Sequence, residues 1–313
     1  MTPSKNTTIT YTSCVGTTLS GLYIASNVLV AQYFEKRRAT ACSLMFAVGG
    51  LNTIVFPPLI ELFYSRYGVH AAFLLYGAIL MNAFPCCVTL RDPPCRPERK
   101  NVVGCFERGL APFVTLSFLV SAVSFPVVSF GMALYVMLSI DLAGDHGVQP
   151  SSSVYLLHAF SASDIVCRAL SGVIIDTKIL SLESVMLLGY LAQGAAFEML
   201  AWFGTFHMMM IASALMGLTC GSRIALQGPM IAKDFGLKKL PVVMGAIYFC
   251  NGVALLLRPS IVGYFRDRHG SYSGLLHSTA AVNGLLVVVW MLKLRNGKNP
   301  VSPTEANLCS EEL

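Results

Sequence analysis

Charged residues divide the chain into long apolar stretches, and the spacing of these stretches predicts transmembrane helices. Four stretches contain no Asp, Glu, Lys or Arg and are each long enough to cross a bilayer once: residues 6–34, 39–60, 67–90 and 109–140. Four further stretches hold at most two charged residues each: 151–175, 184–232, 241–265 and 270–292. The stretch 184–232 is long enough for two spans joined by a turn near Gly204, so the pattern predicts nine spans.

The composition supports a membrane protein. Hydrophobic residues make up 55% of the 313 residues and charged residues only 12%, about half the share usual in a soluble domain. Too few polar side chains remain to cover the surface of a water-soluble body. We therefore predict an all-α membrane protein, a helical bundle of about nine transmembrane helices surrounded by lipid.

The distribution of positive charge predicts the orientation. Of the 22 Lys and Arg, 15 lie in alternate loops on one side, four lie on the other side, and three lie within spans. Because positively charged loops stay in the cytoplasm, the C-terminus is predicted to be cytoplasmic. We expect the plasma membrane, but the sequence has no feature that distinguishes it from an organellar membrane. The net charge of +6 forms no basic stripe with interleaved aromatic residues, so no nucleic-acid partner is expected.

A proline-rich loop at residues 91–108, which contains five Lys and Arg, separates three spans from six. This loop is the predicted domain boundary. The resulting parts are a partial N-terminal bundle, a basic cytoplasmic linker, a six-helix C-terminal bundle and a cytoplasmic tail, at residues 1–90, 91–108, 109–292 and 293–313.

Four charged residues within the spans are candidates for binding a substrate or a proton. Asp164 and Arg168 are four residues apart, so on a helix they share a face and can pair, which offsets part of the cost of burying each charge in a bilayer. A guanidinium also presents a planar fork that fits a carboxylate. Arg223 either lines the substrate path, or snorkels to the interface or pairs with Glu198 of the preceding span. Arg258, before Pro259 at a predicted helix break, is the fourth candidate.

Three segments resemble the monocarboxylate transporter family of the major facilitator superfamily. They are Tyr33–Ala39, which contains Glu35-Lys36-Arg37-Arg38; Ser163–Gly172, which contains Asp164 and Arg168 and is followed by Asp176; and Asp234–Pro241. The resemblance covers about residues 10–292. It implies helices four to twelve of a twelve-helix fold, with the first three helices apparently lacking.

The resemblance implies transport of a small monocarboxylate, similar to lactate or pyruvate, coupled to protons. It also implies a gating or topological role for Glu35, Lys36, Arg37, Arg38 and Asp234. The expected partners are the carboxylate, protons and membrane lipid, with a single-span accessory glycoprotein as a further candidate. Arg258-Pro259-Ser260 stands where the family commonly has Gly-Pro-Pro, so relatives' substrates do not transfer directly.

Two alternatives to this function remain open. One is a truncated or inactive family member that acts as a regulatory or scaffold protein in the membrane. The other is a relative that carries a different substrate, such as an aromatic amino acid, without proton coupling. An enzyme is not expected, because the sequence lacks a zinc-binding HExxH, a GxSxG elbow and a P-loop. No catalytic residue, cofactor or metal site is predicted.

Overall fold

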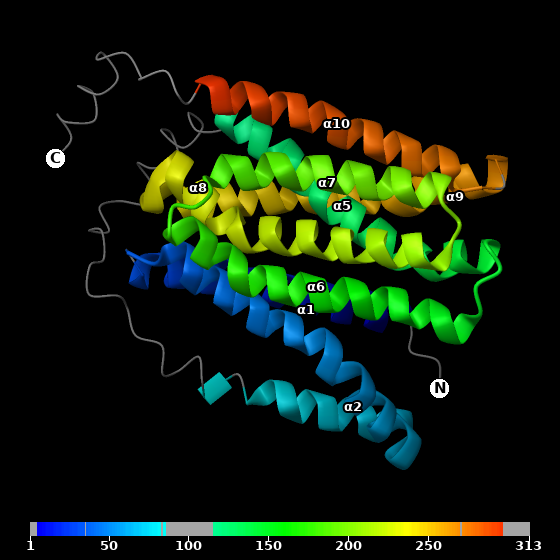
Figure 1. Ribbon diagram of the computed structural model, residues 1–313. Helices are drawn as coiled ribbons and strands as arrows, with labels where there is room; N and C mark the ends of the chain where they lie inside the picture. Colours follow the sequence, from blue (N-terminus) through cyan, green and yellow to red (C-terminus); the bar gives the residue numbers. More distant parts are fainter. Residues whose placement is uncertain (1–4, 35, 83, 86–114, 270, 297–313) are drawn as a thin grey trace, which may run out of the picture.

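The computed structural model describes residues 5–34, 36–82, 84–85, 115–269 and 271–296. Within these residues the chain forms a bundle of α-helices and contains no β-strand (Figure 1). The helices are α1 (Lys5–Tyr33), α2 (Arg38–Met81), α5 (Leu116–Asp145), α6 (Pro150–Asp176), α7 (Leu182–Trp202), α8 (Phe206–Leu256), α9 (Arg258–His269) and α10 (Ser273–Asn296). The predicted all-α class is confirmed.

Local sequence signals define several helix ends. The side chain of Thr115 accepts a hydrogen bond from the backbone N–H of Phe118 (3.4 Å) and begins α5, and Ser181 does the same for Ser184 (3.2 Å) at α7. Ser and Thr at this position satisfy backbone N–H groups that have no partner in the helix. The turn expected near Gly204 lies between the end of α7 and the start of α8, as predicted.

Two glycines interrupt the longest helices. Gly68 in α2 has φ of 76° and Gly236 in α8 has φ of 75°, a left-handed conformation that other residues rarely adopt. Each of these helices is therefore two consecutive segments. A further interruption at Leu257 separates α8 from α9, immediately before Arg258 and Pro259, where the sequence predicted a break.

Six helical segments in the described part of the chain are long and apolar enough to cross a membrane. One of them, Phe206–Arg268, has 63 residues and contains the break at Gly236, so at 1.5 Å per residue it is more than long enough to cross twice. α1 is less apolar and is not among the six. The described helices overlap all nine predicted spans, of which 67–90, 109–140 and 270–292 include residues outside the described ones.

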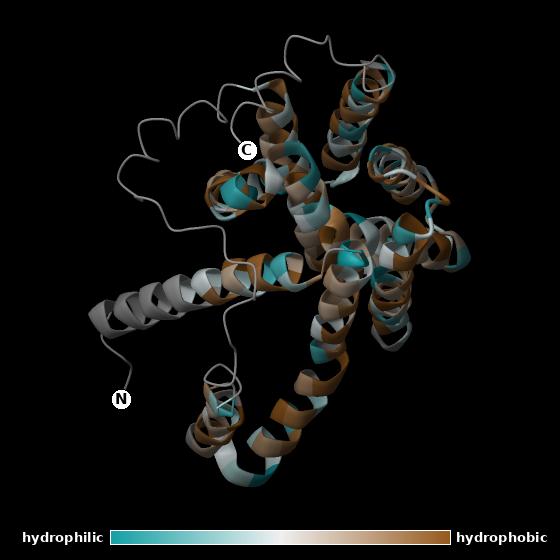
Figure 2. Ribbon diagram, turned by 90° about the vertical axis from the view of Figure 1, so that its left-hand side faces the viewer, coloured by the Kyte–Doolittle hydropathy of each residue, from teal (hydrophilic) through white to brown (hydrophobic). Residues whose placement is uncertain are grey.

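The helices pack with α6 against both α2 and α8, and with α7 against α8 and α10. The largest buried cluster contains side chains from α5 to α8, including Leu134, Phe160, Phe197 and Met216. Many large hydrophobic side chains are exposed on the bundle, among them Phe73, Leu119 and Phe249, and Figure 2 shows hydrophobic residues in brown along most of the helices. Such an apolar exterior suits lipid rather than water.

The pair Gly217 and Gly221 explains the close approach of α8 to α6. A Cβ atom at Gly217 would meet the carbonyl oxygen of Phe160, and one at Gly221 would meet the carbonyl oxygen of Asp164. The spacing of two small residues four apart is typical of helices whose backbones touch within a membrane.

One end of the bundle is used as a reference below. Here α1 and α6 end, α2 begins and α8 is broken at Gly236, and it lies at the left of Figure 1. We call it the Asp176 end, after the last residue of α6. Most of the predicted linker 91–108 and tail 293–313 lies outside the described residues, although α10 continues to Asn296.

Candidate functional site

Asp164 and Arg168 form an ion pair within α6. The Nε atom of Arg168 lies 2.8 Å from Oδ2 of Asp164, and the two side chains are only 11% and 8% exposed, respectively. The pairing that their spacing predicted is therefore present. Both charges lie within an apolar helix, where each alone would be costly to bury.

The pair also contacts the helices on either side of α6. Nη1 of Arg168 donates a hydrogen bond to the carbonyl oxygen of Phe46 in α2 (3.4 Å). Oδ1 of Asp164 has no hydrogen-bond partner among the described residues and lies against Gly221 of α8, where a Cβ would be 3.0 Å away. The pair thus lies where α2 and α8 meet α6, with one carboxylate oxygen still able to accept a proton or a hydrogen bond.

Arg223 lies elsewhere, between α8 and α7. Its side chain is almost fully buried, at 2% exposure. Nε donates to the carbonyl oxygen of Thr219 and Nη2 to Oε1 of Gln193, both at 2.8 Å, and the guanidinium lies 4.6 Å from the ring centre of Tyr190. No described contact joins Arg223 to Asp164 or Arg168.

The suggested pairing of Arg223 with Glu198 is wrong. Glu198 instead contacts Nδ1 of His277 at 2.9 Å and accepts a hydrogen bond from Nε1 of Trp202 at 3.0 Å. Glu198 lies five residues after Gln193 on α7. The sequence gave no signal for its actual partner on α10, His277.

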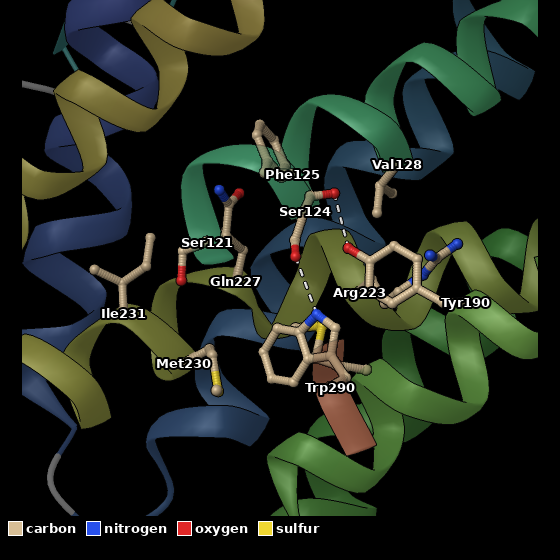
Figure 3. Close-up of a pocket in the computed structure, with 11 residues that line it drawn as sticks. Ser121, Ser124, Phe125, Val128, Tyr190, Arg223, Gln227, Met230, Ile231 and Trp290 are labelled. Carbon is tan, nitrogen blue, oxygen red and sulfur yellow. Dashed lines mark hydrogen bonds between the residues drawn. The ribbon is translucent and has the colours of Figure 1, made fainter. Parts of the chain in front are cut away.

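A small cavity lies beside Arg223 within α5, α7, α8 and α10 (Figure 3). Its volume of about 30 Å³ is enough for roughly one water molecule. Ser124 lines this cavity and bonds two other lining residues. Its carbonyl accepts a hydrogen bond from the hydroxyl of Tyr190 (2.7 Å), and its hydroxyl accepts one from Nε1 of Trp290 (3.0 Å). These bonds tie three helices together around the cavity.

Arg258 is the first residue of α9, which packs against α8 and α10. Its side chain is partly buried, and its Nε atom has no hydrogen-bond partner in the described part of the chain. The structure therefore does not bring Arg258 into contact with the pair in α6.

The predicted gating residues lie at the Asp176 end. Glu35 is outside the described residues, Lys36 and Arg37 are exposed, and Nε of Arg38 donates to the carbonyl oxygen of Ala31 at 2.9 Å. Asp234 pairs with Nζ of Lys293 at 2.7 Å, which joins the break in α8 to α10.

A contact that the sequence did not predict joins α2 and α6 at this same end. Oδ2 of Asp176 accepts hydrogen bonds from both the backbone N–H (2.8 Å) and the hydroxyl (2.6 Å) of Thr40. A carboxylate is unfavourable at the C-terminal end of its own helix but favourable at the N-terminal end of another. An Asp that ends a helix is thus a signal for such a partner, although spacing does not say which helix provides it.

No group of three or more His, Cys, Asp or Glu side chains suited to a metal ion occurs in the part of the chain that the structure describes. The structure therefore offers a buried carboxylate and guanidinium at a helix junction, within a bundle of membrane-spanning length.

Comparison with known proteins gives the family. The model of the Major Facilitator Superfamily matches residues 4–182 and 120–309, and the chain belongs to this superfamily of membrane transporters. It is therefore an integral, multi-pass membrane protein, from a family of transporters rather than enzymes.

Its curated relatives bear out the resemblance seen in the sequence. The chain is 22% identical to monocarboxylate transporter 12 of Rattus norvegicus, over 80% of this chain and 58% of the relative. It is 26% identical to monocarboxylate transporter 3 of the same species (81% and 55%) and 25% identical to monocarboxylate transporter 4 of Mus musculus (80% and 56%). The chain thus spans little more than half the length of these relatives.

Proposed function

We propose that this chain transports a small monocarboxylate, similar to lactate or pyruvate, across the plasma membrane by alternating access and together with a proton. The observation that carries the proposal is the buried ion pair of Asp164 and Arg168, which contacts α2 on one side and α8 on the other. The names of the relatives support the same substrate class.

The proposed cycle depends on partner exchange at Arg168. A carboxylate anion replaces Asp164 at the guanidinium, whose planar fork accommodates two carboxylate oxygens. Asp164 then takes up a proton, because an ionised carboxylate without its partner is costly in this apolar setting. When Arg168 binds the anion, its guanidinium gives up the hydrogen bond to the carbonyl oxygen of Phe46. Loss of this bond allows α6 to move relative to α2.

The bond between Asp176 and Thr40 is the proposed cytoplasmic gate. The count of positive loops supports a cytoplasmic position for this end and for the C-terminus. Lys36, Arg37, Arg38 and Asp234 belong to the same end and keep their proposed roles in gating or topology, as does Glu35.

Replacing Asp176 with Asn is expected to weaken this gate and expose Cys42, which is fully buried in α2 two residues after Thr40. The two hydrogen bonds that Thr40 donates to a carboxylate would be replaced by weaker bonds to a neutral amide. We expect the closed state to lose about 1.4 kcal/mol of stability, which corresponds to roughly a tenfold rise in the population of the open state. Labelling of Cys42 with a maleimide, followed by mass spectrometry, measures this rise. Cys220 of α8 is also fully buried and provides the internal control; an unchanged rate at Cys42 contradicts the gate.

Arg223 and Arg258 remain proposed residues of the substrate path, each held apart from the ion pair. A single-span accessory glycoprotein remains a proposed partner for delivery to the cell surface. Lipid surrounds the apolar exterior of the bundle.

The function is tested by uptake of radiolabelled lactate into cells that express the protein from its complete transcript. We expect saturable uptake that rises as the external pH falls, because one proton accompanies each anion. Surface biotinylation measures the amount of protein at the membrane. A protein that reaches the surface without any uptake contradicts transport and favours a regulatory or scaffold role, whereas pH-independent uptake contradicts only the proton coupling.

A further inference from the structure

The turn that follows α6 has a lysine in a conformation that lysine rarely adopts. Lys178 has φ of 59°, and it is the only residue other than glycine with a positive φ in the part of the chain that the structure describes. Its N–H donates to the carbonyl oxygen of Ile175 (2.9 Å), and the N–H of Ile179 donates to that of Ile174 (3.2 Å). In this type of helix end the left-handed residue is usually glycine. Because a Cβ atom makes the conformation unfavourable, Lys178 costs stability, and such residues cluster at functional sites.

Lys178 lies beside the contact between α6 and α2. It follows Asp176 by two residues, and the carboxylate of Asp176 accepts two hydrogen bonds from Thr40. Lys36 and Arg37 precede Thr40 by four and three residues, just before α2 begins. All three cationic side chains are exposed. The hydrogen bonds between Asp176 and Thr40 therefore have exposed cations on both sides.

Two further lysines lie at the same end of the bundle, on α8. Lys238 and Lys239 follow the break at Gly236 by two and three residues, and both are exposed. α8 packs against both α6 and α2, so these lysines belong to a helix that is next to the other three cations (Figure 1). We call these five residues the basic rim: Lys36, Arg37, Lys178, Lys238 and Lys239.

The charge of the basic rim is not neutralised within the described structure. Each of the three described carboxylates at this end has another partner, in the pairs Asp176–Thr40, Glu183–Lys233 and Asp234–Lys293. No ion pair between described residues includes a member of the basic rim. Several uncompensated cations at a membrane surface attract anions, and multiply charged anions most strongly.

Exposed apolar side chains beside the basic rim favour a lipid over a soluble anion. Ile179 is 71% exposed next to Lys178, and Phe34 is 50% exposed two residues before Lys36. Apolar side chains interspersed with cations are typical of protein surfaces at the headgroup level of a bilayer. The basic rim also lies at the ends of helices of membrane-spanning length, where headgroups are found.

We propose that the basic rim binds the phosphorylated headgroup of a phosphoinositide in the cytoplasmic leaflet. The headgroup bridges Lys36 and Arg37 on the α2 side of the proposed gate and Lys178 on the α6 side, while Lys238 and Lys239 add attraction from α8. Because a phosphorylated inositol ring carries several phosphates, one headgroup pairs with several cations at once, and its binding keeps the gate closed. The inference rests on the orientation and the gate of the proposed function, but binding of the lipid is measured without transport.

Binding is measured by microscale thermophoresis on the protein expressed from its complete transcript and purified in detergent. The probe is dioctanoyl phosphatidylinositol bisphosphate, and the comparison ligands are dioctanoyl phosphatidylcholine and free inositol trisphosphate. We expect the phosphoinositide to bind about 100-fold more tightly than phosphatidylcholine, because each of three cations contributes about fivefold. We also expect it to bind more tightly than the free headgroup, and its affinity to fall as salt is added, because exposed charges are screened.

Lys178→Gly separates the lipid site from the backbone conformation. Glycine adopts a positive φ without strain, so this variant is expected to raise the melting temperature while the affinity for the phosphoinositide falls about fivefold. A lysine that serves only the helix end would give no loss of affinity. Arg66→Gln provides the matched control: it removes one exposed positive charge at the opposite end of α2, before the break at Gly68, and is expected to leave the affinity unchanged.

The bridge across the gate is measured at Cys42. A saturating amount of the phosphoinositide is expected to slow maleimide labelling of Cys42 severalfold, because the lipid holds α2 and α6 together. Phosphatidylcholine is expected to have no such effect, and Lys178→Gly is expected to reduce the protection that the phosphoinositide gives.

Each outcome has a distinct meaning. Equal affinity for the phosphoinositide and phosphatidylcholine, or an equal loss of affinity in Arg66→Gln and Lys178→Gly, overturns the lipid site. Free inositol trisphosphate that binds as tightly as the lipid overturns the assignment to a lipid and identifies a soluble phosphate instead. Lipid binding without protection of Cys42 overturns the bridge if Asp176→Asn raises the labelling of Cys42. If Asp176→Asn leaves that labelling unchanged, the proposed gate is overturned, and the measured affinities alone decide whether the lipid site stands.

Discussion

Carboxylate uptake is expected to fall at least tenfold when Arg168 is replaced with Lys, and at least 30-fold when it is replaced with Met. Lys keeps the positive charge but loses the planar fork that binds two carboxylate oxygens. Met also removes the charge and leaves Asp164 buried without its partner at 2.8 Å. Truncating one partner of a buried charge pair costs about 2–5 kcal/mol of binding free energy. A loss of about 2 kcal/mol already corresponds to about a 30-fold lower affinity. The measurement is initial lactate uptake divided by the amount of protein at the surface.

The companion change, Asp164→Asn, keeps the shape of the side chain and removes its ability to exchange a proton near neutral pH. Uptake is expected to be low and to lose its dependence on external pH. Arg295, exposed near the end of α10, provides the control, and Arg295→Lys is expected to leave uptake unchanged. Wild-type uptake by Arg168→Lys, at equal surface amount, contradicts the proposed role of the guanidinium.

The sequence predicted the helices well because a bilayer imposes a simple rule on each segment. A helix that crosses the bilayer requires about 20 consecutive, predominantly apolar residues. Clusters of charged residues therefore mark the ends of the helices. The break at Leu257 was predicted because Pro259 cannot continue a regular helix. The continuation of α10 to Asn296 was not predicted, because Lys293 was assigned to the tail, yet its amine lies 4.7 Å from the ring centre of Trp290 and pairs with Asp234.

The site was predictable only where its residues are neighbours on one helix. Asp164 and Arg168 are four residues apart, so helical periodicity alone brings them together. The contact of Asp176 with Thr40 joins residues on different helices, and no periodicity specifies which helices are adjacent. Arg223 shows the same limit, since its partner Gln193 is 30 positions away on α7.

Adding a methyl group at Gly221 tests whether this adjacency creates the site. Gly221→Ala is expected to destabilise the protein, although Ala favours a helix by about 1 kcal/mol relative to Gly. The added Cβ meets the carbonyl oxygen of Asp164, a backbone atom that cannot rotate away, and lies 3.0 Å from Oδ1 of the same residue. Overpacking of this kind typically costs about 1–3 kcal/mol, and here it also displaces the carboxylate of the ion pair.

Gly252 provides the matched control on the same helix, because a Cβ there meets no atom within 4 Å. Gly252→Ala is therefore expected to leave stability unchanged or to raise it slightly, the opposite sign to Gly221→Ala. Thermal unfolding of the two variants in detergent measures the difference, and lactate uptake is expected to fall only for Gly221→Ala. Equal melting temperatures would mean that α6 and α8 do not approach as closely as the backbone contact at Gly221 requires, and that the position of Asp164 does not depend on α8.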